Sequence, residues 1–262
     1  MRVRIVSLLI VLVAALAACG PDVRPAAPGQ LLYVTTFDAF TQDWDLYQGE
    51  LAAQIVDVGQ NPVLRLTVDE VQAGGFTVLN QYFGNFDLIV QATQFAGPDN
   101  NGFGVLFRHQ NNDNYYSFLI SGDGYYQVDR RLNGVDHPLS DWAPIPVIQR
   151  GQATNAIRVI GQGDTFTFLI NDVQVPLCLT IWNPAAPGEC QVSGDVPEGQ
   201  SRWSTDAVVW QLVDDAFPNG RIGLAARSFD ERGVEIDFDN LIVCGPQATP
   251  TIPFQCEEDL SL

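Results

Sequence analysis

Three carboxylates lie at alternating positions late in the chain: Glu235, Asp237 and Asp239. Alternation places them on one face of a strand, and a pair of carboxylates can supply the acid and the base for glycoside hydrolysis. In a regular strand, neighbouring members are two rises apart, about 6.6–6.8 Å, whereas retaining enzymes need ~5–5.5 Å. The spacing therefore favours a structural role, with Asp239 and Asn240 bonding to the N-terminal strand, over catalysis.

The segment 115–132 predicts a different kind of site, which binds without reacting. A three-residue turn at 122–124 pairs Phe118 with Val128, because only this register gathers the apolar side chains on one face. The opposite face, joined by the strand 102–109, then carries aromatic, charged and amide side chains: Arg108, Tyr115, Ser117, Tyr125, Gln127, Asp129 and Arg131. Aromatic rings stack on the C–H patches of sugars while polar groups bind their hydroxyls. We expect this face to bind carbohydrate; the alternative is an ordinary half-solvated sheet surface.

Other chemistry is less well supported. Oxygen-rich loops at 98–101 and 111–114, and Asp38 opposite Asp239, could ligate Ca²⁺, although polar turns use the same residues without metal. The two histidines, His109 and His137, have no partner in the sequence, and the common catalytic and nucleotide-binding motifs are absent. We name no catalytic residue and no certain cofactor, and leave calcium as an open alternative.

The elements that position these residues are short strands. Between residues 31 and 243 no amphipathic helix is found, and short apolar or alternating runs are separated by Gly, Asn, Asp and Pro, which is typical of an all-β sandwich. The clearest runs are 31–37, 63–68, 86–92, 102–109, 115–121, 125–132, 154–160, 165–170, 221–226 and 234–243.

Three stretches, 100–134, 155–175 and 220–243, resemble the concanavalin A-like lectin/glucanase families, close to the laminin G-like and 3-keto-disaccharide hydrolase domains. The resemblance implies a two-sheet antiparallel jelly-roll sandwich whose front sheet carries a ligand groove on its outer face. It also implies, as an alternative function, a hydrolase or lyase acting on a modified disaccharide. The segment 235–239 is similar to the E-x-D-x-x-E signature of family 16 glycoside hydrolases, but its last carboxylate is an aspartate, one position early, and lies in the last strand.

Four cysteines beyond residue 19 are an even number, which suits disulfides in an exported chain. They allow three pairings, and the equal separations favour the two local pairs, Cys178–Cys190 and Cys244–Cys256, each stabilising by roughly 3 kcal/mol. A metal site is disfavoured because there is no CxxC spacing. The first pair would staple an insertion at about 176–210, which offers a surface for a protein partner and so a third, structural or adhesive, function.

The N-terminus predicts export. Arg2 and Arg4 precede an apolar run of ~11 residues, too short to span a membrane, and residues 16–19 resemble the bacterial lipobox. We therefore expect a signal peptide at 1–18, a lipidated Cys19 with a Pro/Gly spacer to residue 30, the jelly-roll domain at 31–245 and a tail at 246–262. This architecture indicates a lipid anchor in a cell or outer membrane, on the extracytoplasmic face.

The net charge of −18, with all 13 basic residues being arginine, excludes nucleic acid as a partner and disfavours contact with anionic lipid head groups. The leading hypothesis is thus a membrane-anchored extracytoplasmic domain that binds carbohydrate non-catalytically and touches the membrane only through its lipid.

The anchor gives a direct test. Cys19→Ala is expected to release the protein from the membrane fraction without changing its thermal unfolding, because the spacer separates the lipid from the domain. Cell fractionation followed by a melting curve measures both. Retention of this variant in the membrane fraction would contradict the lipoprotein assignment.

Overall fold

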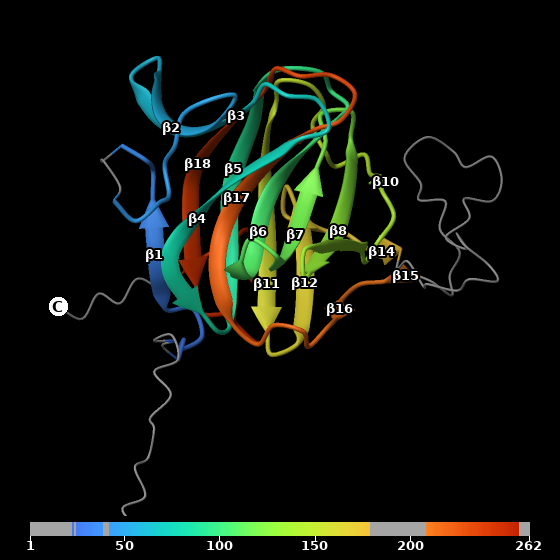
Figure 1. Cartoon of the computed structure of the whole chain (residues 1–262). Coiled ribbons are helices and arrows are strands. Elements are labelled where there is room, and N and C mark those ends of the chain that lie inside the picture. Colours follow the sequence, from blue (N-terminus) through green and yellow to red (C-terminus); the bar gives the residue numbers. More distant parts are fainter. Residues whose placement is uncertain (1–22, 24, 39–41, 179–207, 257–262) are drawn as a thin grey trace, which may run out of the picture.

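The computed structural model describes residues 23, 25–38, 42–178 and 208–256, and all regular elements in them are β-strands. Two antiparallel sheets pack face to face (Figure 1), so the predicted all-β, two-sheet antiparallel sandwich is confirmed. None of the described residues belongs to a helix long and apolar enough to cross a membrane.

The front sheet has seven strands, in the order β10-β8-β7-β6-β17-β4 with β9 beside β8. Its strands are β4 (Gly74–Phe83), β6 (Asn101–Asn111), β7 (Asn114–Ile120), β8 (Tyr125–Leu132), β9 (Val135–Pro138), β10 (Ala143–Pro144) and β17 (Gly220–Ser228).

The back sheet has nine strands, in the order β13-β12-β11-β5-β18-β3-β2, with β1 beside β18 and β16 beside β12. Its strands are β1 (Leu31–Thr35), β2 (Leu51–Val58), β3 (Asn61–Val68), β5 (Phe86–Ala96), β11 (Thr154–Gln162), β12 (Thr165–Ile170), β13 (Val173–Gln174), β16 (Leu212–Val213) and β18 (Val234–Cys244).

A separate two-stranded ladder closes the base of the predicted insertion. β14 (Leu177–Cys178) pairs with β15 (Val208–Val209), so the two described ends of the insertion lie side by side. Cys190, the predicted partner of Cys178, lies outside the described residues, so that disulfide stays a prediction.

The hydrophobic core fills the space between the two sheets, and the register of the β7–β8 hairpin decides which side chains enter it. Phe118 pairs with Val128 and Ile120 with Tyr126, and all four are buried. The Phe118 ring lies 4.8 Å from that of Phe168 on β12, so the inner faces of the two sheets meet here. The predicted register, with its three-residue turn, is confirmed.

The strand β6 does not alternate to its end. Between Leu106 and His109, two residues of β6 oppose one residue of β17, which is a β-bulge. Arg108 has a φ of 54°, and Gly220 packs so closely that a Cβ there would lie 2.3 Å from the Arg108 carbonyl carbon. The bulge turns Arg108 into the core and gives the outward position to His109, so the expectation that Arg108 joins the outer face is wrong.

The C-terminal residues are held on the back sheet by an arginine that also forms a buried ion pair. Arg158 on β11 donates from Nε and Nη2 to the two carboxylate oxygens of Asp87, at 2.8 and 2.7 Å, and from Nη1 to the Thr251 carbonyl at 2.7 Å. Its guanidinium also lies 4.9 Å from the centre of the Phe254 ring. The predicted Cys244–Cys256 disulfide is present, so bonds of three kinds hold this segment in place.

Breaking the buried Asp87–Arg158 pair should lower the free energy of unfolding far more than breaking a surface pair. Asp87→Ala is expected to lower the free energy of unfolding by about 3–5 kcal/mol, because it strands a buried guanidinium, whose side chain is 2% exposed. Glu235→Ala is the matched control, since it removes a half-exposed carboxylate from Arg65 and should cost about 0–1 kcal/mol. Urea unfolding of both variants measures the difference; equal losses would contradict the assignment.

Candidate functional site

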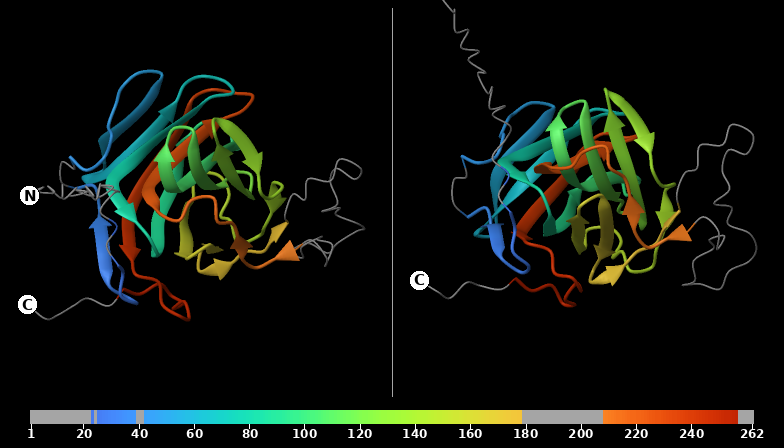
Figure 2. Two further views of the ribbon diagram at one scale, coloured as in Figure 1. Left: turned by 60° about the horizontal axis from the view of Figure 1, so that its bottom comes forward. Right: turned by 90° about the horizontal axis from the view of Figure 1, so that it is seen from below.

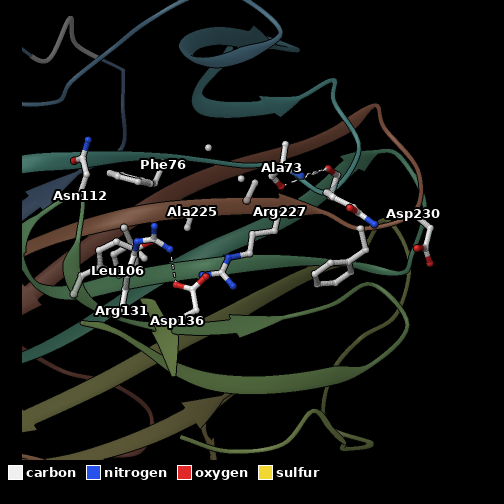
Figure 3. Close-up of a pocket in the computed structure, with 16 residues that line it drawn as sticks. Ala73, Phe76, Leu106, Asn112, Arg131, Asp136, Ala225, Arg227 and Asp230 are labelled. Atoms are coloured by element: carbon white, nitrogen blue, oxygen red, sulfur yellow. Dashed lines mark hydrogen bonds and ion pairs between the residues drawn. The ribbon is translucent and has the colours of Figure 1, made fainter. Parts of the chain in front are cut away.

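A groove of about 620 Å³ lies on the outer face of the front sheet. We call it the front groove and define it by six of the residues that line it: Phe76, Leu106, Tyr115, Arg131, Asp136 and Arg227. Figure 3 shows Phe76 on one side and the Arg131–Asp136 pair on the other, with the Arg227 side chain reaching toward this pair. The groove therefore crosses the sheet from β4 to β9.

The floor of the groove is apolar and aromatic. Tyr115 is 7% exposed and its ring lies 5.7 Å from that of the half-buried Phe76. Leu106, Leu119 and Ala225 belong to the same small apolar cluster on this outer face. Because Phe76 keeps part of its ring accessible, it offers a surface on which a flat apolar patch of a ligand can stack.

Two ion pairs form the polar part of the groove. Arg131 Nη1 lies 2.8 Å from Asp136 Oδ1, and Arg227 Nη1 lies 3.3 Å from Asp129 Oδ2. The hydrogen bond that Arg131 donates to the Asp136 carboxylate raises the pKa of Arg131. Burial raises the pKa of Asp129 to about 6, although the charge of Arg227 opposes this rise. Each pair joins one arginine to one carboxylate, so the two pairs add no net charge to the groove.

His109 lies beneath the aromatic floor. Its ring stacks on Tyr115 at 5.8 Å and lies 5.7 Å from Phe76. The side chain is fully buried, and neither ring nitrogen has a hydrogen-bond partner in the described part of the chain. Burial, reinforced by the charge of Arg221, lowers the pKa of His109 to about 4, while Asp45 partly opposes the shift. The neutral imidazole thus extends the apolar floor.

Three of the predicted face residues lie at the groove. Tyr115 and Arg131 line it, and Asp129 supports it from behind by holding Arg227. Two further residues lie on the predicted face but are buried: Ser117, between Leu106 and Asp129, and Gln127, which donates to the Ser140 carbonyl. Arg108 is in the core.

Tyr125 lines a second hollow, of about 460 Å³, beside the front groove. Tyr125 is 38% exposed there. Trp142 and Phe229, whose rings meet edge to face at 6.0 Å, contribute to its wall. Phe229 and Asp230 line both hollows, so the predicted single face is two adjoining depressions.

Three groove residues were not predicted from the sequence: Phe76, Asp136 and Arg227. Of these, Asp136 could have been placed from a turn signal. Asn133 and Gly134, both with positive φ, form the two-residue turn between β8 and β9. Asn-Gly is the strongest local signal for such a hairpin, and applying it pairs Arg131 with Asp136, as observed. Phe76 and Arg227 carry no comparable signal, because their neighbours across the sheet are far away in the sequence.

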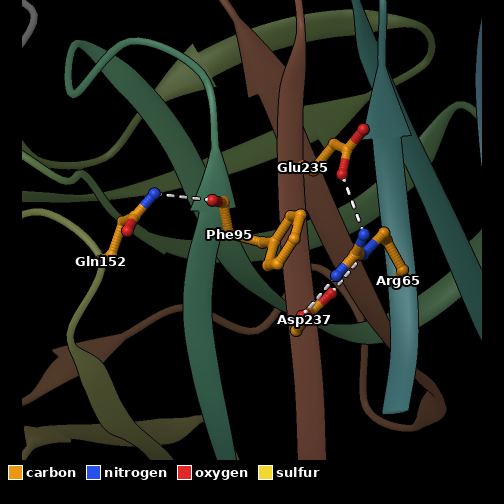
Figure 4. A network of polar contacts seen from close by, with 5 residues as sticks. All are labelled: Arg65, Phe95, Gln152, Glu235 and Asp237. Carbon is orange, nitrogen blue, oxygen red and sulfur yellow. Dashed lines mark hydrogen bonds and ion pairs between the residues drawn. The ribbon is translucent and has the colours of Figure 1, made fainter. Parts of the chain in front are cut away.

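The carboxylate trio lies on the outer face of the back sheet, away from the groove. Arg65 binds both oxygens of Asp237, at 2.6 and 2.8 Å, and reaches Glu235 at 3.0 Å. The same guanidinium lies 3.7 Å from the centre of the Phe95 ring (Figure 4). These contacts fit the structural role expected from the spacing.

Asp239 and Asn240 do not bond to the N-terminal strand through their side chains in the way that the sequence predicted. Asp239 accepts a hydrogen bond from Asn61 on β3, and Asn240 donates to Gln91 on β5. The strand β18 is therefore tied to its two long neighbours, β3 and β5, by these side chains rather than to the N-terminal strand β1.

The loops considered for calcium use their polar groups internally. Asn111 Oδ1 accepts bonds from the Asp113 backbone and the Asn114 side chain, and Asn101 donates to the Pro98 carbonyl. Among the described residues, no three or more His, Cys, Asp or Glu side chains are grouped to hold a metal ion. Calcium binding stays an untested expectation.

Solved structures of similar fold include a carbohydrate-binding module, CBM66, from Bacillus subtilis, with a TM-score of 0.50 and 13% identity over 77% of this chain and 94% of the module. A Bacillus subtilis protein of unknown function with a galectin-like fold has a TM-score of 0.53 and 10% identity, over 84% of this chain and 98% of that protein. A xylan β-1,4-xylosidase from Bacillus halodurans C-125 has a TM-score of 0.53 and 12% identity, over 86% of this chain and 41% of the enzyme. Comparison of the sequence with protein families finds no match, and neither does comparison with curated proteins. The similarity shows the fold, a β-sandwich of two antiparallel sheets.

The buried histidine predicts a pH dependence of stability. Its folded pKa of about 4 is below the value of about 6.5 in an unfolded chain, so the unfolded state binds more protons between these values and stability falls as the pH drops through this range. His109→Phe keeps the aromatic packing and removes the titration. Its stability relative to the wild type should rise by up to about 3 kcal/mol from pH 7.5 to pH 4.

Urea unfolding of both proteins at several pH values measures this difference, because the titration of the other groups cancels in the comparison. A difference between the two that does not vary with pH would show that His109 is not buried in its neutral form.

Proposed function

We propose that this protein binds a carbohydrate in the front groove without catalysing a reaction. The observation that carries the proposal is the half-buried ring of Phe76, set across the groove from the Arg131–Asp136 pair. A sugar ring presents C–H patches that stack on an aromatic face and hydroxyls that bond to charged side chains. The fold of a carbohydrate-binding module among the solved neighbours supports this assignment.

The alternative, hydrolysis of a glycosidic bond, has less support in the described residues. Glu235 and Asp237 are held by Arg65 on the other sheet. Asp129, whose pKa is raised as that of a general acid would be, is 4% exposed and bonded to Arg227. It therefore supports the wall of the groove rather than pointing a proton at a ligand.

The location of the groove suits the anchor that we also propose, a lipidated Cys19 on the extracytoplasmic face of a cell or outer membrane. The support is the lipobox-like sequence before Cys19. The chain enters the domain through β1, a strand of the back sheet, whereas the groove is on the front sheet. A tether at this end would thus leave the groove open to an external polysaccharide.

The structural or adhesive alternative depends on the insertion at about 176–210. Its residues 179–207 lie outside the described residues, so a protein partner for this segment remains a separate hypothesis.

Two phenylalanines give a matched test of the groove. Phe76→Ala should weaken carbohydrate binding by about tenfold or more, since loss of a stacked ring costs ~1–3 kcal/mol. Phe95→Ala removes a ring that is 44% exposed on the back sheet and should leave binding unchanged. A screen of the full-length protein on immobilised neutral and acidic oligosaccharides identifies the ligand, and calorimetry compares the variants. Equal affinities of the two variants would place the site elsewhere.

A further inference from the structure

We infer that the front groove accepts uncharged glycan chains and discriminates against acidic ones such as polyuronates and sulfated polysaccharides. This inference rests on the proposed function, because it specifies the class of carbohydrate that the groove takes. It is carried by the pairing of the arginines that line the groove.

The paired arginines match the hydrogen-bonding character of hydroxyl groups. A guanidinium has five N–H donors and a carboxylate has two acceptor oxygens, and the Arg131–Asp136 contact uses one of each. The pair therefore presents donors and acceptors side by side, held in position by their own attraction. A hydroxyl donates and accepts, so it can bond to both members, whereas a carboxylate or sulfate only accepts.

No arginine that lines the groove is left with an unbalanced charge in the described structure. Arg131 pairs with Asp136, and Arg227 pairs with the almost fully buried Asp129. The adjoining hollow on the other side of Phe76, of about 330 Å³, contains Arg221, and its guanidinium lies 3.8 Å from Asp45. Each cation that an acidic sugar would seek already has an anionic partner.

The surrounding charge acts in the same direction. Asp230 lies at the end of the groove and the whole chain has a net charge of −18. An acidic chain would have to displace a carboxylate from its arginine and approach a negative surface, and both steps cost free energy. An uncharged chain meets neither cost, so the groove selects by rejecting the wrong ligand as well as by binding the right one.

The inference predicts a gain of binding. Asp136 is 47% exposed, so Asp136→Asn should fold normally, and it leaves Arg131 free to bind a carboxylate through two parallel hydrogen bonds. The ligands are the best neutral oligosaccharide of the screen and its derivative oxidised to a carboxylate at C6, which differ in charge at one position. The wild type should bind the oxidised form at least tenfold more weakly. Asp136→Asn should recover about tenfold of this loss at low salt.

The control is Asp69→Asn. It makes the same change in net charge at an exposed aspartate that also faces an arginine, Arg232 at 3.9 Å, outside the front groove. It should not alter binding of either ligand. Recovery by both variants would indicate a general effect of net charge and would overturn the inference.

The two proposals fail in different ways. If the wild type binds acidic oligosaccharides as well as or better than neutral ones, the inferred selectivity is wrong but the groove still binds carbohydrate. If no oligosaccharide of either charge is bound, the proposed function itself is wrong.

Discussion

The bulge in β6 is the constraint on which the front groove depends. It requires Gly220, since any Cβ there would collide with the Arg108 backbone. By turning inward, Arg108 places its guanidinium 5.5 and 5.7 Å from the centres of the Phe86 and Phe166 rings and donates to the Pro218 and Gly163 carbonyls. Burial lowers the pKa of Arg108 to about 10. The neutral His109 then occupies the outward position and packs beneath the aromatic floor. In a regular strand, the cationic Arg108 would point outward there instead.

Regular alternation is what made the sandwich predictable. The pairing of Phe118 with Val128 followed from the need to collect apolar side chains on one face, and the local spacing of Cys244 and Cys256 indicated their bond. The bulge could not be predicted, because it depends on the approach of β17, more than a hundred residues later in the chain. Gln127 lies on the predicted face, opposite Leu119, but it is buried and donates to the Ser140 carbonyl, and nothing in the hairpin itself indicates this contact.

The two outer faces show how similar side chains acquire different roles. Arg65 on the back sheet is paired with two carboxylates and lies over the Phe95 ring, whereas Arg131 on the front is paired with Asp136 and lies opposite Tyr115 on the next strand. On the back sheet the guanidinium of Arg65 stacks directly on Phe95, so the ring and the cation bind each other. On the front sheet the ring of Phe76 packs instead against Tyr115 and His109. The ring and the charges are thus separated by a hollow, and both remain available to a ligand.

The chain enters the back sheet at β1, beside β18 (Figure 2), and this position determines how the fold would bear a pulling force. A force applied to the chain before residue 25 would reach the fold at β1, where Leu31 pairs with Cys244 and Gly29 and Gln30 exchange backbone hydrogen bonds with Gly245. A pull along β1 loads its bonds to β18 together, in shear, rather than one after another. Cys244 is in turn covalently joined to Cys256, and Arg158 holds that segment against β11. The point at which tension would enter is therefore cross-linked to the middle of the sandwich.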